Sequence, residues 1–206
     1  MDRKVVISRY NEPLDWISGI ECDYIIYNKG DKIENPDIPK EKIISVPNEG
    51  REAETFLRYI VSNYNNLPES IVFIQGNPFD HFPETLKTIN SVDSDDMIRM
   101  GPQTSCDGNG VPSYPGLPLK VLQKIIMPEI EINLFSFTAG AQMLVNKSYI
   151  LNKPLLWWES VFSIYNAYWF SNIESGYGHK PGVFIAHAFE RLWEYIFKYE
   201  IVKENE

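Results

Sequence analysis

The chain has 206 residues, 44% of them hydrophobic, and its formal net charge is −9. This length suits one domain, and 5 Trp, 12 Tyr and 11 Phe can build a sizeable core, which argues against global disorder. The acidic balance argues against binding to a nucleic-acid backbone, which needs a basic face, so we expect no nucleic-acid partner.

The two cysteines and the N-terminus bear on the cellular compartment. Cys22 and Cys106 have neither the spacing of a metal site nor the density of a disulfide scaffold. The chain enters an apolar run without a signal-peptide region, and no stretch approaches the ~20 apolar residues of a membrane-spanning helix. We therefore expect a soluble protein of the cytoplasm, or of the host cytoplasm if the protein is viral.

The first part of the chain alternates short apolar runs with one amphipathic segment. Runs rich in β-branched residues predict buried strands at 4–8, 23–27, 42–46 and 70–74, with a short helix or turn at 15–20. A helix is predicted between the third and fourth strands, because its apolar residues have the spacing of one buried face: Ala53, Phe56, Leu57, Ile60, Val61 and Tyr64. This alternation favours one α/β domain over residues 1–206, with a mostly parallel central sheet and helices on both faces.

The second part is less regular. Residues 101–118 contain four Pro and four Gly, which predicts a long irregular loop that covers the site as a lid or contacts a neighbouring domain. Further on, the patterns predict helices at 119–127, 155–170 and about 183–199, and strands at 133–137 and 141–145.

Polar clusters follow the strands at 4–8 and 70–74, and ligands of open α/β sheets bind outside the carboxyl ends of such strands. After the first strand, Arg9 is suited to a phosphate because its planar fork pairs with two oxygens, and Tyr10 offers a stacking surface. The alternative is a solvated loop in which Glu12 caps the next turn.

A second candidate is the start of the predicted helix, at residues 48–52. A helix N-terminus with a glycine and Arg51 suits a phosphate, because free N–H groups and the macrodipole both favour an anion. The alternative is an ordinary helix start in which Arg51 pairs with Glu54 or Glu12.

The stretch 75–81 contains the best metal candidates. Asn77 and Asp80 offer two oxygens from one turn, as Mg²⁺ or Mn²⁺ prefers, and His81 suits Mn²⁺ but not Mg²⁺. Asp93-Ser94-Asp95 is interpreted as a solvated acidic turn, since no strand precedes it.

Glu190 precedes Arg191 on the last predicted helix, among aromatic residues. The two side chains form either a buried ion pair or a site in which Glu190 is a general base, with its pKa raised by apolar neighbours.

Several blocks together resemble a small, mostly uncharacterised glycosyltransferase-like family of bacteria, fungi and large algal viruses. They are also similar to the N-terminal GT-A glycosyltransferase domain of a chlorella-virus protein. The blocks that carry the resemblance are residues 6–12 with Trp16, 26–30, 48–52, 57–60, 73–81, 140–142 and 190–193.

The resemblance implies a GT-A fold, a nucleotide-sugar donor (a UDP-sugar is favoured), Mn²⁺ or Mg²⁺, and a glycan or glycoprotein acceptor. It departs from the GT-A pattern at one place, where the Asp-x-Asp after the fourth strand is replaced by Gln75-Gly76-Asn77. The residues expected to bind the donor are Ser8, Arg9, Tyr10, Glu12, Asn28, Lys29, Arg51, Gln75 and Gly76. The expected metal ligands are Asn77, Asp80 and His81, and the candidate catalytic bases are Glu190 and then Glu159.

The residues and the resemblance together predict a glycosyltransferase that moves a sugar from a nucleoside diphosphate to a glycan hydroxyl with metal assistance. The alternative is a catalytically inactive nucleotide-sugar or glycan-binding module. A purely structural domain would leave the polar strand ends unexplained.

Overall fold

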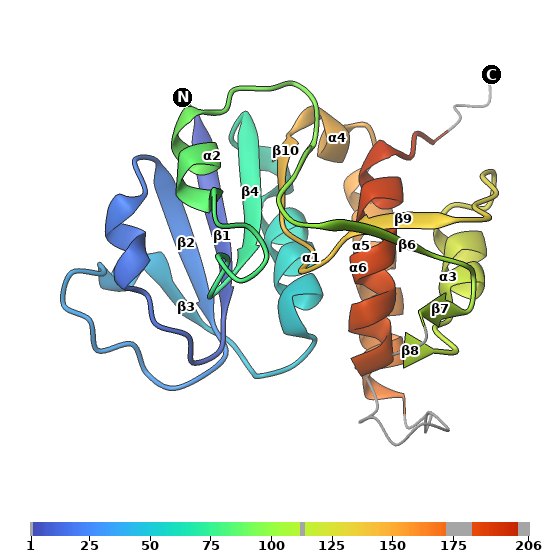
Figure 1. Ribbon diagram of the computed structural model, residues 1–206, viewed down its shortest axis with the longest axis horizontal. Helices are drawn as coiled ribbons and strands as arrows, with labels where there is room; N and C mark the ends of the chain where they lie inside the picture. The colour runs from blue at the N-terminus through green and yellow to red at the C-terminus, as the bar shows by residue number, and fades with distance from the viewer. Residues whose placement is uncertain (1, 112–113, 172–182, 202–206) are drawn as a thin grey trace.

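A computed structural model describes residues 2–111, 114–171 and 183–201 (Figure 1). Its centre is a six-stranded sheet in the order β3-β2-β1-β4-β10-β5. The first four of these strands are parallel, and β10 is antiparallel to both of its neighbours. Their bounds are β1 Arg3–Arg9, β2 Asp23–Asn28, β3 Ile43–Ser45, β4 Ser70–Gln75, β5 Ile98–Arg99 and β10 Met143–Asn146.

Helices cover both faces of this sheet, as expected. Alternate side chains of β1 enter two hydrophobic clusters, with Val6 in the larger one and Val5 and Ile7 in the smaller one. Helices α1 (Arg51–Asn63), α5 (Leu155–Phe170) and α6 (Val183–Lys198) pack on the larger cluster. The 3₁₀ helix η1 (Asp15–Gly19) and α2 (Thr85–Ser91) pack on the smaller one.

A second layer of structure lies beyond α6 (Figure 1). It contains the antiparallel pair of β6 (Gln103–Cys106) and β9 (Phe135–Thr138), and helix α3 (Leu119–Ile126). The remaining short elements are the hairpin of β7 (Gly110–Val111) and β8 (Tyr114–Pro115), helix α4 (Ser148–Leu151), and the 3₁₀ turns η2 (Lys40–Lys42) and η3 (Tyr64–Asn66).

The prediction of an irregular loop at 101–118 is therefore wrong in part. The side chains of Gln103, Thr104 and Ser105 are polar and exposed, so β6 lacks the apolar pattern from which a strand is predicted. Its stability comes from backbone pairing with β9, for example between Gln103 and Thr138. Helices α2 and α4 and strand β5 were not predicted either.

The strand order reverses at β1, which separates the connections that leave the carboxyl ends of β1 and β4. From β1 the chain continues to β2 and β3 on one side, and then returns to β4 on the other side of β1. Ser8 and Gln75 consequently lie side by side at the carboxyl ends of β1 and β4. Such a reversal of strand order opens a crevice in α/β sheets. In the described part of the chain, no helix is long and apolar enough to cross a membrane.

Candidate functional site

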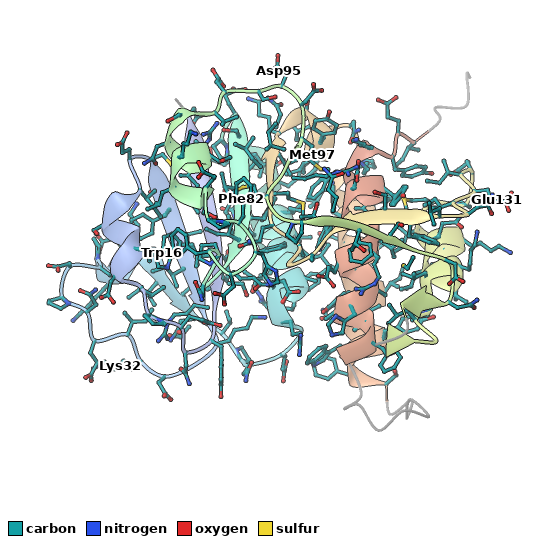
Figure 2. The ribbon with its side chains drawn as sticks, viewed as in Figure 1. Trp16, Lys32, Phe82, Asp95, Met97 and Glu131 are labelled. Carbon is teal, nitrogen blue, oxygen red and sulfur yellow. The ribbon has the colours of Figure 1, made fainter. Side chains whose placement is uncertain are left out.

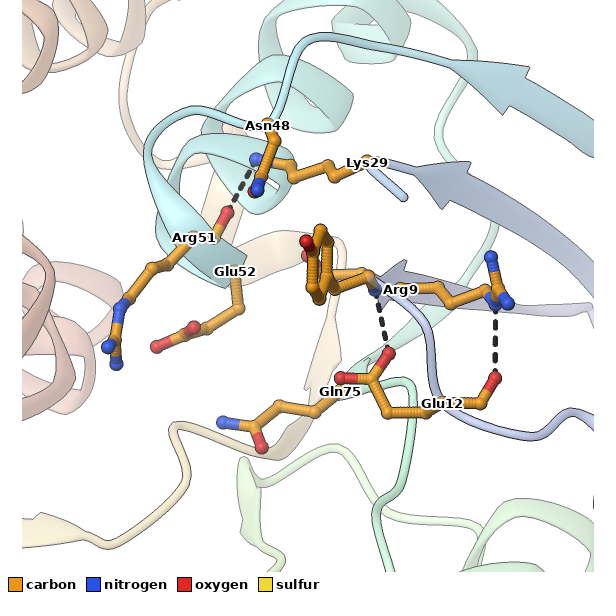
Figure 3. Close-up of a pocket in the computed structure, with 9 residues that line it drawn as sticks. Arg9, Glu12, Lys29, Asn48, Arg51, Glu52 and Gln75 are labelled. Carbon is orange, nitrogen blue, oxygen red and sulfur yellow. Dashed lines mark hydrogen bonds between the residues drawn. The ribbon is translucent and has the colours of Figure 1, made fainter. Parts of the chain in front are cut away.

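A cleft of about 350 Å³ lies at this reversal of strand order, a volume suited to a small-molecule ligand (Figure 3). Its walls are the ends of β1, β2 and β4 and the start of α1, as the sequence predicted. The lining residues are Ser8, Arg9, Tyr10, Glu12, Lys29, Asn48, Arg51, Glu52 and Gln75.

The start of α1 has an unusual backbone, which buried side chains hold in place. Gly50 and Arg51 are both left-handed, with φ of 64° and 44°. A side chain at Gly50 would place its Cβ 2.2 Å from the Cβ of Glu54, so only glycine fits. Arg51 adopts this conformation without being a glycine, which costs about 1–3 kcal/mol and requires support from its surroundings.

That support comes from hydrogen bonds to three consecutive carbonyl groups. The ammonium group of Lys29 donates to the carbonyl oxygens of Glu49 (2.5 Å) and Arg51 (2.6 Å). The hydroxyl of Tyr165 donates to the carbonyl oxygen of Gly50 (2.8 Å). The first turn of α1 is thereby fixed where Arg51 and Glu52 line the cleft.

Lys29 was expected to bind the donor, but its ammonium group is fully engaged. In addition to the two carbonyls, it pairs with the Glu54 carboxylate at 2.8 Å, and both side chains are buried. Burial lowers the pKa of Lys29, and the charge of Glu54 partly opposes this effect. Lys29 therefore shapes the cleft and does not present a free charge to it.

Arg9 and Asn28 are engaged in a similar way. The guanidinium of Arg9 donates to Asn28 Oδ1 (2.6 Å) and to the carbonyl oxygens of Glu12 (3.1 Å) and Asp31 (2.9 Å). The amide of Asn28 donates to the carbonyls of Gly30 and Asp31. Figure 3 shows the guanidinium of Arg9 directed away from Glu52 and Gln75. The expected phosphate contact of Arg9 is thus replaced by a role in holding the loop after β1.

Of the remaining donor candidates, all but Gly76 line the cleft: Ser8, Tyr10, Glu12, Arg51 and Gln75. Tyr10 lines the cleft with 52% of its surface exposed, so its ring is available for stacking. Glu12 accepts a hydrogen bond from the Tyr10 backbone N–H (2.7 Å). A side chain at Gly76 would meet the Glu12 carboxylate at 2.5 Å, so Gly76 provides the space for it. The hydroxyl of Ser8 contacts that of Thr55 on α1 at 3.0 Å.

Glu52 also lines the cleft, although the sequence patterns did not single it out as a site residue. Its side chain extends from the first turn of α1 into the cleft, toward the same side as the carboxamide of Gln75 (Figure 3). Burial raises the pKa of Glu52, and the nearby negative charge of Glu190 raises it further. Its position at a helix N-terminus beside Arg51 was the available signal.

Glu190 has the opposite environment, which corrects the expectation of a raised pKa. Its Oε1 accepts from the Gly140 backbone N–H (2.7 Å), and its Oε2 accepts from Arg191 (2.6 Å) and lies 3.5 Å from His187 Nδ1. Burial alone would raise the pKa of Glu190, but these contacts with His187, Arg191 and Gly140 outweigh it and lower the pKa. The ion-pair interpretation of Glu190 and Arg191 matches the structure.

Glu159, the second candidate base, is exposed on α5 and does not line the cleft. A base must come within hydrogen-bond reach of the proton that it removes. The position of Glu159 therefore gives no support to a role in proton transfer at this cleft.

The three candidate metal ligands do not form one set of donors. Asn77 donates to the exposed Asp80 carboxylate (2.9 Å), and neither residue lines the cleft. His81 packs on Gly140, where a Cβ would come within 2.6 Å of the imidazole ring. Among the described residues, no group of three or more His, Cys, Asp or Glu is arranged to hold a metal ion. Asp93 and Asp95 are exposed, and Figure 2 shows Asp95 at the molecular surface.

Trp16 fixes the loop that carries Asn77 and Asp80. Its indole N–H donates to the Gly76 carbonyl oxygen (3.0 Å), and its ring meets that of Phe79 edge to face, with 5.6 Å between centroids. Gln142 holds the other side of this loop through the Pro78 carbonyl oxygen (3.0 Å).

The fold and cleft define an α/β protein with a cleft at the carboxyl ends of its parallel strands. Comparison with known families gives one match: residues 5–101 fit the model of a family described as "Protein of unknown function (DUF3431)". No curated protein and no solved structure matches the chain. The matched segment includes all the residues that line the cleft, whereas Gly140 and Glu190 lie outside it.

Proposed function

We propose that the chain is a GT-A-type glycosyltransferase that binds a nucleoside-diphosphate sugar, with a UDP-sugar favoured, in the cleft and transfers the sugar to a glycan hydroxyl. The observation that carries this proposal is the position of the cleft, between the carboxyl ends of parallel strands and the start of α1. A mostly parallel sheet with helices on both faces is compatible with the GT-A fold that the sequence blocks suggested.

The cleft offers a place for each part of such a donor. The exposed ring of Tyr10 suits the nucleobase, because aromatic rings stack on bases. The first turn of α1 and the Arg51 side chain suit the diphosphate, which becomes more negative as the sugar leaves. Glu52 and Gln75 then remain for the sugar and the incoming hydroxyl.

Metal assistance has a limited part in this proposal. Asp80 is the first carboxylate that follows β4 in the sequence, and it lies outside the cleft lining. A divalent cation would therefore take most of its ligands from the diphosphate and water, as Mg²⁺ commonly does. Because the candidate ligands do not fit a protein-built site, no step of the reaction is assigned to the metal.

The second candidate is a binding module for nucleotide sugars or glycans that has no catalytic activity. The specific observation in its favour is Gln75-Gly76-Asn77, which stands where the resemblance implies Asp-x-Asp. Such a module would bind the same donor in the same cleft but would release no nucleoside diphosphate.

The proposal is tested by calorimetric titration with UDP-glucose, UDP-galactose, UDP-N-acetylglucosamine and GDP-mannose, with and without Mn²⁺. We expect one of them to bind, and Arg51→Ala to weaken that binding about 5- to 150-fold, because a charged hydrogen bond contributes about 1–3 kcal/mol. Lys87→Ala is the matched control, since Lys87 is an exposed cation on α2.

Release of nucleoside diphosphate in the presence of a panel of methyl glycosides separates the two candidates. Release indicates a transferase, and binding without release indicates a module. If none of the four donors binds at millimolar concentration, the proposal is wrong.

A further inference from the structure

Glu52 and Glu190 are two carboxylates in the same region with contrasting surroundings. Glu190 accepts hydrogen bonds on both of its oxygens, from Gly140 and Arg191, and it contacts His187. Among the described residues, no other side chain forms a hydrogen bond or ion pair with Glu52, whose one such contact is with its own backbone N–H. The contacts of Glu190 thus favour its ionised form, whereas Glu52 lines the cleft and can accept a proton there.

We infer that Glu52 is the general base of the proposed glycosyl transfer and that Glu190 is a positioning residue that acts on it. This inference rests on the proposed function. It assigns proton transfer to a residue that enters the cleft from α1, in place of the two carboxylates expected from the sequence.

The step that follows is a direct displacement. The acceptor oxygen attacks the anomeric carbon, and a new C–O bond forms. At the same time the C–O bond to the diphosphate breaks, and its electron pair leaves with the diphosphate. The hydroxyl proton of the acceptor passes to the carboxylate of Glu52. Because attack and departure occur on opposite sides of the carbon, the product has the inverted anomeric configuration.

The charges around Glu52 support this division of roles. On α1, Arg51 lowers the pKa of Glu52, and on α6 the positive charge that His187 carries when protonated acts in the same direction. Burial and the charge of Glu190 outweigh both, so the pKa of Glu52 is raised. A base works best when its pKa approaches the working pH, and environments that separate two carboxylate pKa values commonly mark distinct roles. The other ionisable residues that line the cleft are Arg9, Tyr10, Glu12 and Lys29.

The test compares Glu52→Gln with the wild-type protein, using the sugar nucleotide that binds best in the panel above. Glutamine keeps the size of the side chain but cannot take the proton. We expect kcat to fall about 10²- to 10⁴-fold, while the Kd for the donor changes less than about threefold. Glu34→Gln is the matched control, because Glu34 is exposed on the loop after β2.

Glu190→Gln tests the positioning role through the pH profile. Loss of the Glu190 charge lowers the pKa of Glu52, so the acidic limb of kcat/KM should move to lower pH. The carboxyl ¹³C resonances of the two residues, assigned with both variants, give a second readout that needs no activity. We expect Glu52 to titrate at higher pH than Glu190.

The outcomes distinguish the proposed function from the assignment of Glu52 as the base. Failure of every donor to bind or react overturns the proposed function and the base assignment with it. Normal turnover by a folded Glu52→Gln variant, a product of retained configuration, or titration of Glu52 below Glu190 overturns the assignment of Glu52 and leaves donor binding in the cleft intact. A Glu190→Gln profile that does not move overturns the positioning role alone.

Discussion

Lys29 and Glu54 form a buried ion pair, with 2.8 Å between Nζ and Oε2, at the point where β2 meets α1. Glu54 also pairs with Arg58 on the next turn of the helix, at 2.5 Å. Because Lys29 holds two carbonyls of the preceding loop as well, one side chain joins the sheet, the helix and the cleft wall.

Lys29→Met should be strongly destabilising. It leaves the carboxylate of Glu54 buried with Arg58 as its remaining partner, and removal of one partner of a buried pair costs about 3–5 kcal/mol. Urea denaturation measures the change. Lys32→Met is the control, since Lys32 is 85% exposed, and its effect should stay within about 0.5 kcal/mol. A loss below 1 kcal/mol for Lys29→Met would show that the pair has little structural importance.

Lys153 predicts a pH dependence of stability. It is fully buried, and its ammonium group donates to Asn152 Oδ1 (2.7 Å) and to the carbonyls of Tyr149 (3.0 Å) and Phe197 (2.9 Å). Burial lowers its pKa to about 7. Between pH 7 and about 10 the unfolded chain therefore binds more protons than the folded one, so the free energy of unfolding should rise with pH, by up to about 1.4 kcal/mol per pH unit.

Denaturation curves at several pH values for the wild type and Lys153→Met test this expectation. The wild-type protein should gain stability relative to the variant as the pH rises from 7 to 10, because methionine does not titrate. At every pH the variant lacks the hydrogen bonds that Lys153 donates to the carbonyls of Tyr149 and Phe197. A difference in stability that is constant over this range would place the pKa of Lys153 near that of an ordinary lysine.

Gly140→Ala should destabilise the protein through its contact with His81. The backbone has φ of 86° at Gly140, and a Cβ there would lie 2.6 Å from Cδ2 of His81. We expect a loss of about 2–3 kcal/mol from overlap and backbone strain together. In the double variant with His81→Ala the overlap disappears, and a loss of about 1 kcal/mol from strain should remain. Additive effects in this double-mutant cycle would mean that the two residues are not in contact.

Asp80→Ala tests the metal interpretation. If Asp80 is a direct ligand, the variant should lose the part of donor affinity that Mn²⁺ adds, on the order of 1–3 kcal/mol. Replacement of both Asp93 and Asp95 by Ala is the control, because these carboxylates are exposed. Calorimetric titration with and without Mn²⁺ gives both values, and a larger effect from the control would mean that the wrong acidic cluster was chosen.

The strands β1, β2 and β4 and the helix α1 were predicted because their signals are local. The strands contain short continuous apolar runs, and the apolar residues of α1 repeat with the period of a helix. Helix α2 was missed because threonines form much of its buried face, so the apolar pattern is absent. Strand β6 was missed because its side chains are exposed and its stability comes from pairing with a distant strand.

The position of the site could be predicted, but the direction of its side chains could not. Strand ends are visible in a sequence, and the cleft lies where three of them meet. Whether a charged side chain faces the cleft depends on its hydrogen-bond and ion-pair partners, which lie far from it in the sequence. Glu54 is 25 residues from Lys29, and Gly140 is 50 residues from Glu190. These pairings made Lys29 and Glu190 structural residues and left Glu52 facing the cleft.

The antiparallel direction of β10 brings a late part of the chain to the cleft that an early part lines. Because β10 runs against β4, its beginning, with Gly140, lies at the same edge of the sheet as the carboxyl end of β4. Residues 5–101 provide the lining of the cleft, while the Gly140 turn and Glu190 on α6 come from the sequence that follows. A protein that shares residues 5–101 alone would have a pocket of similar shape. Without Glu190, the charges that set the pKa of Glu52 would differ. Chimaeras joined near residue 101 would therefore exchange reactivity while preserving ligand preference.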